Sequence, residues 1–151
     1  AKLGRLRRLN SIIKDMKKFL KFWLPVIVWA VVIYSFSSIK TPSTSEIFWQ
    51  DFMVKKTAHV VEYGILAVLL YRAFRSQGLN KTRAGTMAII LAAGYGGTDE
   101  FHQSFTAGRE PTVRDVVFDT IGATLGIYII WKLLPNLPPR LKTLAKSLDL
   151  L

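Results

Sequence analysis

Acidic and amide side chains follow directly after an apolar stretch of this chain. Asp99, Glu100 and Gln103 come after the run MAIILAAGYGG, and Asp115 and Asp119 open the next apolar segment. Crowded carboxylates can act as general acids and bases, and they can also hold a cationic or hydrogen-bonding ligand. A third account is structural, with ion pairs and caps joining the ends of neighbouring helices.

A second polar group lies in the preceding apolar segment. His59, Glu62 and Tyr63 stand three and four positions apart, so a helix places them on one face. Arg109, between the two acidic groups, is the expected countercharge, because a guanidinium can pair with a carboxylate or a phosphate in two parallel hydrogen bonds. The predicted ligand-binding residues are His59, Glu62, Tyr63, Asp99, Glu100, Gln103, Arg109, Asp115 and Asp119.

Helical spacing separates the roles of the acids. Asp99 and Gln103 are four positions apart, as are Asp115 and Asp119, so each pair shares a face. Glu100 lies about 100° around the helix from Asp99, which predicts different partners for the two adjacent acids.

Four apolar segments position these groups. They cover Phe22–Ser38, Ala58–Phe74, about Gly85–Phe101 and Val113–Leu134, and each approaches the ~20 residues that a helix needs to cross a bilayer. The sequence predicts an all-α membrane bundle of four transmembrane helices. Gly122 and Gly126, with Ala93 and Gly97, predict that the third and fourth helices form a tight pair.

Lys and Arg set the predicted orientation. Of the 21 such residues, sixteen lie before the first apolar segment, around the second connection, or at the end of the fourth segment and beyond it. Their excess on one side predicts that both termini are cytoplasmic, in a multi-pass protein of the bacterial cytoplasmic membrane. All the candidate polar residues then fall at one depth, near the outer surface.

Three regions are expected. Residues 1–21 combine a stripe of leucines with eight basic residues, which predicts an amphipathic interfacial helix on the anionic inner leaflet. Residues 22–134 form the transmembrane domain, and residues 135–151 form a cytoplasmic tail. The formal net charge of +11 would suggest nucleic acid for a soluble protein, but the amphipathic pattern favours a membrane surface instead.

The segments KTAHVVEYGILAVLLYRAF and TDEFHQSFTAGREPTVRDVVFDTIGATLGI resemble the VanZ-like family of small bacterial membrane proteins. The family pattern has His, Glu and Tyr on one helix, then Asp-Glu-x-x-Gln-x-Phe, a Gly-Arg loop and an Asp-x-x-x-Asp/Asn-x-x-Gly helix. The resemblance covers about residues 55–130. It implies an association with low-level resistance to teicoplanin, a glycopeptide with a lipid tail. The matching positions are His59, Glu62, Tyr63, Asp99, Glu100, Gln103, Phe105, Gly108, Arg109, Asp115, Asp119 and Gly122.

Two functions follow as expectations, with partners drawn from membrane lipids. In the first, the polar residues bind a lipidated glycopeptide or a lipid-linked envelope precursor, as a monomer or an oligomer. In the second, the chain is an enzyme that hydrolyses a lipid head group or precursor, with His59, Glu62, Asp99 and Glu100 as catalytic groups. The chain has no cysteine, so activated water is favoured over a thiol nucleophile. No cofactor is predicted, and a divalent metal such as zinc, manganese or calcium is left open.

Overall fold

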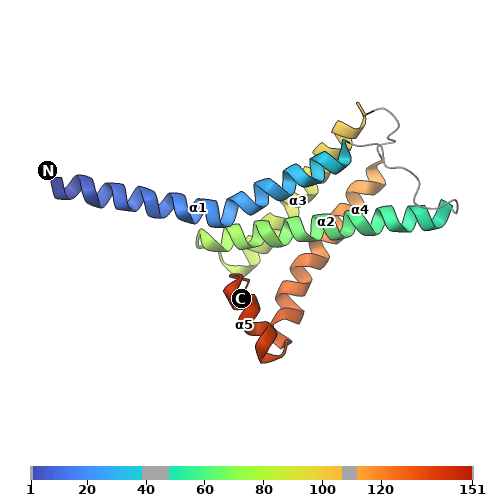
Figure 1. Ribbon diagram of the computed structural model, residues 1–151. Coiled ribbons are helices and arrows are strands. Elements are labelled where there is room, and N and C mark those ends of the chain that lie inside the picture. Colours follow the sequence, from blue (N-terminus) through green and yellow to red (C-terminus); the bar gives the residue numbers. More distant parts are fainter. Residues whose placement is uncertain (1, 39–47, 107–111, 151) are drawn as a thin grey trace.

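The chain folds into helices throughout the part that the structure describes. In the computed structural model, residues 2–38, 48–106 and 112–150 are described, and no strand occurs among them. The long helices are α1 (Lys2–Ser37), α2 (Phe48–Ser76), α3 (Lys81–Gln103) and α4 (Val113–Tyr128) (Figure 1). After α4 come a π-helical turn, Ile129–Leu133, a 3-10 turn, Leu134–Asn136, and the short helix α5 (Pro139–Ser147).

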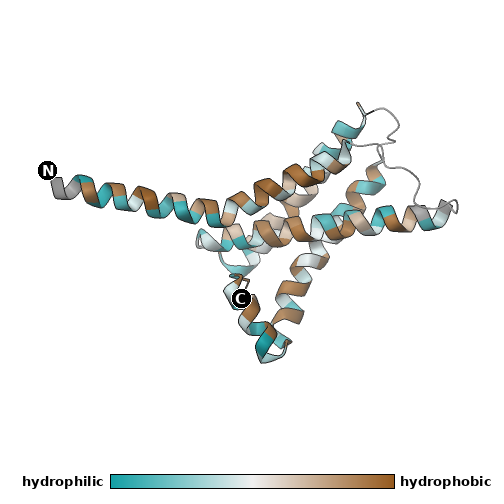
Figure 2. Cartoon of the chain, viewed as in Figure 1, coloured by the Kyte–Doolittle hydropathy of each residue, from teal (hydrophilic) through white to brown (hydrophobic). Residues whose placement is uncertain are grey.

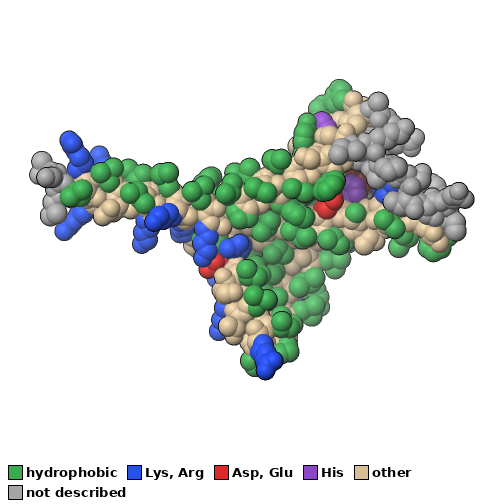
Figure 3. Space-filling model, in the orientation of Figure 1, with side chains coloured by type: hydrophobic (Ala, Val, Ile, Leu, Met, Phe, Trp, Pro, Cys, Tyr) green, Lys and Arg blue, Asp and Glu red, His purple; other side chains and the backbone are tan. Residues whose placement is uncertain are grey.

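Three of the helical stretches in the described residues are long and apolar enough to cross a membrane. They are Arg5–Ser37, Phe52–Ser76 and Val113–Asn136. The expected third crossing, α3, is not among them, because its glycines, threonines and terminal acids lower its hydropathy. The surface agrees with a lipid environment, since apolar residues are frequent along the helices of the bundle (Figure 2) and hydrophobic side chains cover much of the face drawn in Figure 3. Leu24, Val28 and Val31 of α1, for example, are each about half exposed.

The expected interfacial helix and first transmembrane helix form one uninterrupted helix, α1. The ribbon bends near its middle, and the basic half extends away from the other helices (Figure 1). Pro25 lies inside α1, and a proline ring removes one backbone hydrogen bond and clashes with the carbonyl four residues earlier. The proline accounts for the bend. The position of the basic half on a lipid surface stays a prediction.

The four long helices run alternately up and down. Trp23 near the middle of α1 packs edge-on against Phe74 at the end of α2, with ring centroids 5.6 Å apart. Further along α1, the Trp29 indole donates a hydrogen bond to the Glu62 carbonyl at 2.9 Å. Rising numbers on α1 therefore meet falling numbers on α2, so these helices are antiparallel.

A tight turn reverses the chain between α2 and α3. Gly78 has a φ of +91°, a left-handed conformation that glycine adopts without steric cost. Its N–H donates to the Arg75 carbonyl, and the N–H of Leu79 donates to the Phe74 carbonyl, which closes the end of α2. Asn80 then caps α3 by accepting a hydrogen bond from the Arg83 N–H at 2.8 Å.

The closest helix packing joins α2 and α4, which run in the same direction. A Cβ atom on Gly126 would lie 2.6 Å from the Gly64 carbonyl oxygen, and one on Gly122 would overlap the backbone of Val60. The prediction that Gly122 and Gly126 pack against the third helix is wrong. These glycines face α2, because only there does a helix backbone come close enough to exclude a side chain.

Helix α3 packs on this pair through small residues. Ala84, Ala88, Ala92 and Gly96 recur every four positions and are buried. A Cβ on Gly96 would lie 2.6 Å from Oδ2 of Asp119, so this glycine makes room for a carboxylate of α4. Gly97, which was expected in the interface, has no atom within 4 Å of its Cβ position.

Gly122→Ala tests the α2–α4 contact. We expect the new methyl group to force the two backbones apart and to lower the free energy of unfolding by about 1–3 kcal/mol, as overpacking does. Gly97→Ala is the matched control, because it adds the same methyl group in open space and gains helix propensity. Thermal unfolding in detergent micelles measures both. Equal stability of the two variants would contradict the packing.

Candidate functional site

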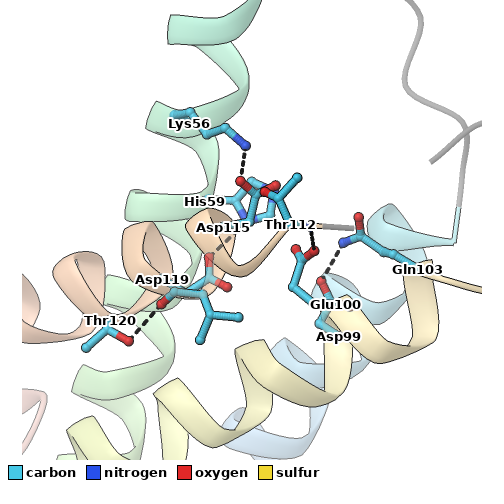
Figure 4. A network of polar contacts seen from close by, with 10 residues as sticks. Lys56, His59, Asp99, Glu100, Gln103, Thr112, Asp115, Asp119 and Thr120 are labelled. Carbon is cyan, nitrogen blue, oxygen red and sulfur yellow. Dashed lines mark hydrogen bonds and ion pairs between the residues drawn. The ribbon is translucent and has the colours of Figure 1, made fainter. Parts of the chain in front are cut away.

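Side chains from three helices meet at one end of the bundle. They come from the first half of α2, the last turn of α3 and the first turns of α4 (Figure 4). We call this group the polar cluster. Its members are Lys56, His59, Asp99, Glu100, Gln103, Asp115 and Asp119.

The polar cluster is mostly hidden from the surroundings. Asp99, Glu100, Gln103 and Asp115 are buried, and Asp119 is fully inaccessible. Buried carboxylates are costly unless they are paired or hydrogen-bonded. Their partners therefore decide what the cluster can do.

Lys56 supplies the countercharge for α4. Its Nζ donates to Oδ1 of Asp115, and both side chains are nearly buried, with exposures of 13% and 11%. The sequence pattern had predicted Arg109 as the countercharge and not Lys56, and Arg109 lies outside the described residues. A signal was present, because Lys56 stands three positions before His59 and seven before Tyr63, on the same helical face.

His59 pairs with the fully buried Asp119. The distance from Nδ1 of His59 to Oδ1 of Asp119 is 2.9 Å. The imidazole is also stacked parallel to the ring of Tyr63, with centroids 6.3 Å apart. Because Nδ1 is engaged by the carboxylate, Nε2 is the ring nitrogen left for a ligand or substrate.

The two acids of α3 have different partners, as their angular separation predicted. Gln103 donates from Nε2 to Oδ2 of Asp99 at 2.9 Å. The backbone N–H of Thr112 donates to Oε2 of Glu100 at 2.8 Å. Thr112 is the residue that precedes α4, so Glu100 joins the end of α3 to the start of α4.

Several buried oxygen atoms of this region have no hydrogen-bond partner among the described residues. They are Oδ1 of Asp99, Oε1 of Glu100, Oδ2 of Asp119 and the hydroxyl of Tyr63. An unsatisfied buried polar atom costs roughly 1–3 kcal/mol, so a group of them calls for a reason such as bound water, an ion or a ligand. The three carboxylate oxygens can accept hydrogen bonds from a guest molecule.

Two other predicted residues, Glu62 and Tyr63, lie on α2 together with His59. Glu62 is half-buried, and its backbone carbonyl is bonded to Trp29. Tyr63 is completely buried beside His59. His102 turns to α1 instead, where its ring lies 4.5 Å from that of Tyr34. The functional roles of Glu62, Tyr63 and Arg109 stay predictions.

The described residues contain no group of three or more His, Asp or Glu side chains arranged to hold a metal ion. Within the polar cluster, the acids are divided among Lys56, His59, Gln103 and the Thr112 N–H. The arrangement suits hydrogen-bond acceptance and proton exchange at His59.

The family comparison agrees with these positions. The family model described as VanZ/LLP1 matches residues 7–135. The chain belongs to the VanZ-like family. The match includes α1, whereas the sequence resemblance covered only about residues 55–130. Together with three helices able to span a bilayer, membership makes this VanZ-like chain a membrane protein. Neither a curated protein nor a solved structure matches it significantly.

Removing one member of the Lys56–Asp115 pair should destabilise the VanZ-like chain. We expect Lys56→Met and Asp115→Asn each to lower the free energy of unfolding by about 3–5 kcal/mol, because each leaves a charge buried alone. The double variant should recover most of that loss. Thermal unfolding of the purified protein in neutral detergent supplies the measurement.

Arg83→Met is the control for this cycle, since it removes an exposed cation from the start of α3. Its effect should stay within roughly 0.5 kcal/mol. Losses that simply add in the double variant would show that Lys56 and Asp115 do not interact.

Proposed function

We propose that this VanZ-like protein binds the head of a lipid-linked or lipid-tailed molecule in its polar cluster, at the outer face of the bacterial cytoplasmic membrane. The observation that carries the proposal is the set of buried carboxylate oxygens on α3 and α4 that have no donor among the described residues. Hydroxyl, amide or ammonium groups of a ligand would satisfy them. The paired side chains around them would orient the ligand.

The proposed location requires four membrane crossings, and the directions and lengths of the helices support that number. Helices α2 and α4 are parallel and can each span a bilayer, so the chain between them has to return across it. Helix α3 has 23 residues and is therefore about 35 Å long, enough for that return. The Lys and Arg distribution then favours cytoplasmic termini and an outward-facing polar cluster.

Exposed apolar side chains border the polar cluster. Phe101 in the last turn of α3 and Phe105, just after that helix, are 70% and 74% exposed, and Val113 at the start of α4 is 85% exposed. In a bilayer these side chains would contact lipid at the level of the cluster. A ligand with an acyl tail could keep the tail in lipid while its head reaches the acids. A lipidated glycopeptide such as teicoplanin, the antibiotic associated with the family's namesake, fits this description.

One observation favours an enzyme as the second candidate. A histidine whose Nδ1 is held by a buried carboxylate is a recurrent general base, because the carboxylate orients the ring and stabilises its charged form. His59 and Asp119 have this arrangement. Nε2 of His59 would activate water for attack on a lipid head group or envelope precursor, with Glu62, Asp99 or Glu100 as acid.

Binding is tested with purified protein in neutral detergent, titrated with a lipidated glycopeptide and with its non-lipidated counterpart. Glu100→Gln and Asp99→Asn should weaken binding of the lipidated compound by roughly 10–100-fold. This is the loss of affinity expected when a hydrogen bond to a charged group is removed. Asp15→Asn, which alters an exposed acid on the basic half of α1, should bind as the wild type does. Equal affinity of all variants would refute the site.

Cells expressing Glu62→Gln, Asp99→Asn, Glu100→Gln or Arg109→Ala at wild-type abundance should lose resistance to the lipidated compound. Unchanged resistance in all four would contradict the role of the polar cluster. The enzyme candidate adds a separate expectation. Membranes containing the wild type should then accumulate a hydrolysis product that His59→Gln abolishes.

A further inference from the structure

A cavity lies at the opposite end of the bundle from the polar cluster. It has a volume of about 390 Å³ and is formed by the end of α2, the start of α3, the turns after α4 and the segment that follows α5. Along α2, Arg72 on its wall is thirteen residues beyond His59, which corresponds to about 20 Å. The two sites are therefore separate.

The cavity wall is strongly basic. Arg72, Arg75, Lys81 and Lys146 line it, and Asp149 is the acid among the lining residues. In the space-filling view, Lys and Arg side chains gather at the end of the bundle where α5 lies (Figure 3). Four cations against one carboxylate give the wall a net charge of about +3. Such a wall attracts an anion.

The Arg72 side chain is held in place and can donate further hydrogen bonds to an anion. Its guanidinium lies over the ring of Phe22, 5.1 Å from the centroid, and this contact holds the side chain in place. Its Nε is buried and has no hydrogen-bond partner among the described residues. Its Nη2 lies 3.5 Å from Oδ2 of Asp149, at the limit for a hydrogen bond. Arg72 thus keeps donor capacity that the chain itself uses only in part.

The Asp149 carboxylate lies where an anionic ligand of this cavity would bind. Its carboxylate accepts from Lys21 of α1 at 2.6 Å and faces Arg72. The hydrogen bond from Lys21 holds the pKa of the Asp149 carboxyl below its usual value, so the group stays charged at neutral pH. Asp149 has a φ of 55° and ends α5 in a Schellman motif, with its N–H on the Lys146 carbonyl and that of Leu150 on the Ala145 carbonyl.

The rest of the wall is apolar. Phe22, Tyr71, Ile130, Pro135 and Leu150 line the cavity beside the basic residues. A basic half and an apolar half match a phosphate attached to a hydrophobic or glycerol-like group. The basic half matches inorganic phosphate equally well.

From this arrangement we infer that the cavity between Arg72, Lys81, Lys146 and the segment after α5 is a binding site for a phosphate group of net negative charge, and that the Asp149 carboxylate competes for it. The phosphate comes either from an anionic membrane lipid or from a soluble phosphate. Removal of a lining cation weakens binding. Removal of the Asp149 charge strengthens it, because Lys21 and Arg72 become available.

The test uses the full chain in neutral detergent and three probes: short-chain phosphatidic acid, phosphatidylcholine with the same acyl chains, and inorganic phosphate. Apparent affinities come from the dose dependence of the melting temperature. Lys146→Gln should weaken binding of the effective probe about fivefold, the usual worth of one basic residue near an anionic lipid. Arg140→Gln, on α5 but outside the cavity wall, is the matched control and should leave the affinity unchanged.

Asp149→Asn should strengthen binding about fivefold. Asparagine keeps the left-handed φ that the end of α5 requires, so the variant removes charge without opening the motif. Asp149→Gly, which suits the same conformation, should strengthen binding as well. Saturation by phosphatidic acid but not by inorganic phosphate supports the site and assigns it to lipid, and saturation by both assigns it to the phosphate group alone. Equal affinity of wild type, Lys146→Gln and Asp149→Asn, weaker binding by Asp149→Asn, or preference for phosphatidylcholine would overturn the inference.

Discussion

The parallel contact between α2 and α4 controls the rest of this molecule. Two helix backbones can come this close only where side chains are absent, at Gly64, Gly122 and Gly126. The contact fixes how far one helix is shifted along the other. Asp119 lies about one turn before Gly122 on α4, and the shift places it opposite His59 of α2. Asp115 lies one turn earlier still, and it is opposite Lys56 of α2. Packing of backbones and pairing of charges thus depend on the same register.

Parallel neighbours in one membrane bundle impose a topology. If α2 and α4 both cross the membrane, as proposed, α3 is the segment that returns between them. Helix α3 is less apolar than α2 and α4, with small residues facing the α2–α4 pair and acids at its end. Gly96 shows the connection most directly, since its missing side chain accommodates the Asp119 carboxylate. The features that make α3 a poor membrane span by composition are those that complete the polar cluster.

The two ends of the bundle have opposite electrostatic character. The polar cluster presents carboxylate oxygens that lack donors within the described part of the chain, while the cavity at the other end presents guanidinium and ammonium groups. In both places the chain satisfies part of its own charge, through Lys56 at one end and Asp149 at the other. Each internal partner reduces the cost of burying charge in the absence of a ligand and leaves some hydrogen-bonding capacity unused.

The sequence by itself determined the properties that follow from local spacing. Apolar segment lengths predicted the helical class, four-residue spacing predicted that Asp99 and Gln103 share a helix face, and the 100° step predicted a different partner for Glu100. These inferences hold because helical geometry relates residues of a single segment. Only the tertiary structure decided which helix the glycines of α4 face, that Lys56 pairs with Asp115, and that Asp149 lies against Lys21 and Arg72. Such contacts depend on the steric fit and register of segments far apart in the chain, and periodicity within one helix carries no information about its neighbour.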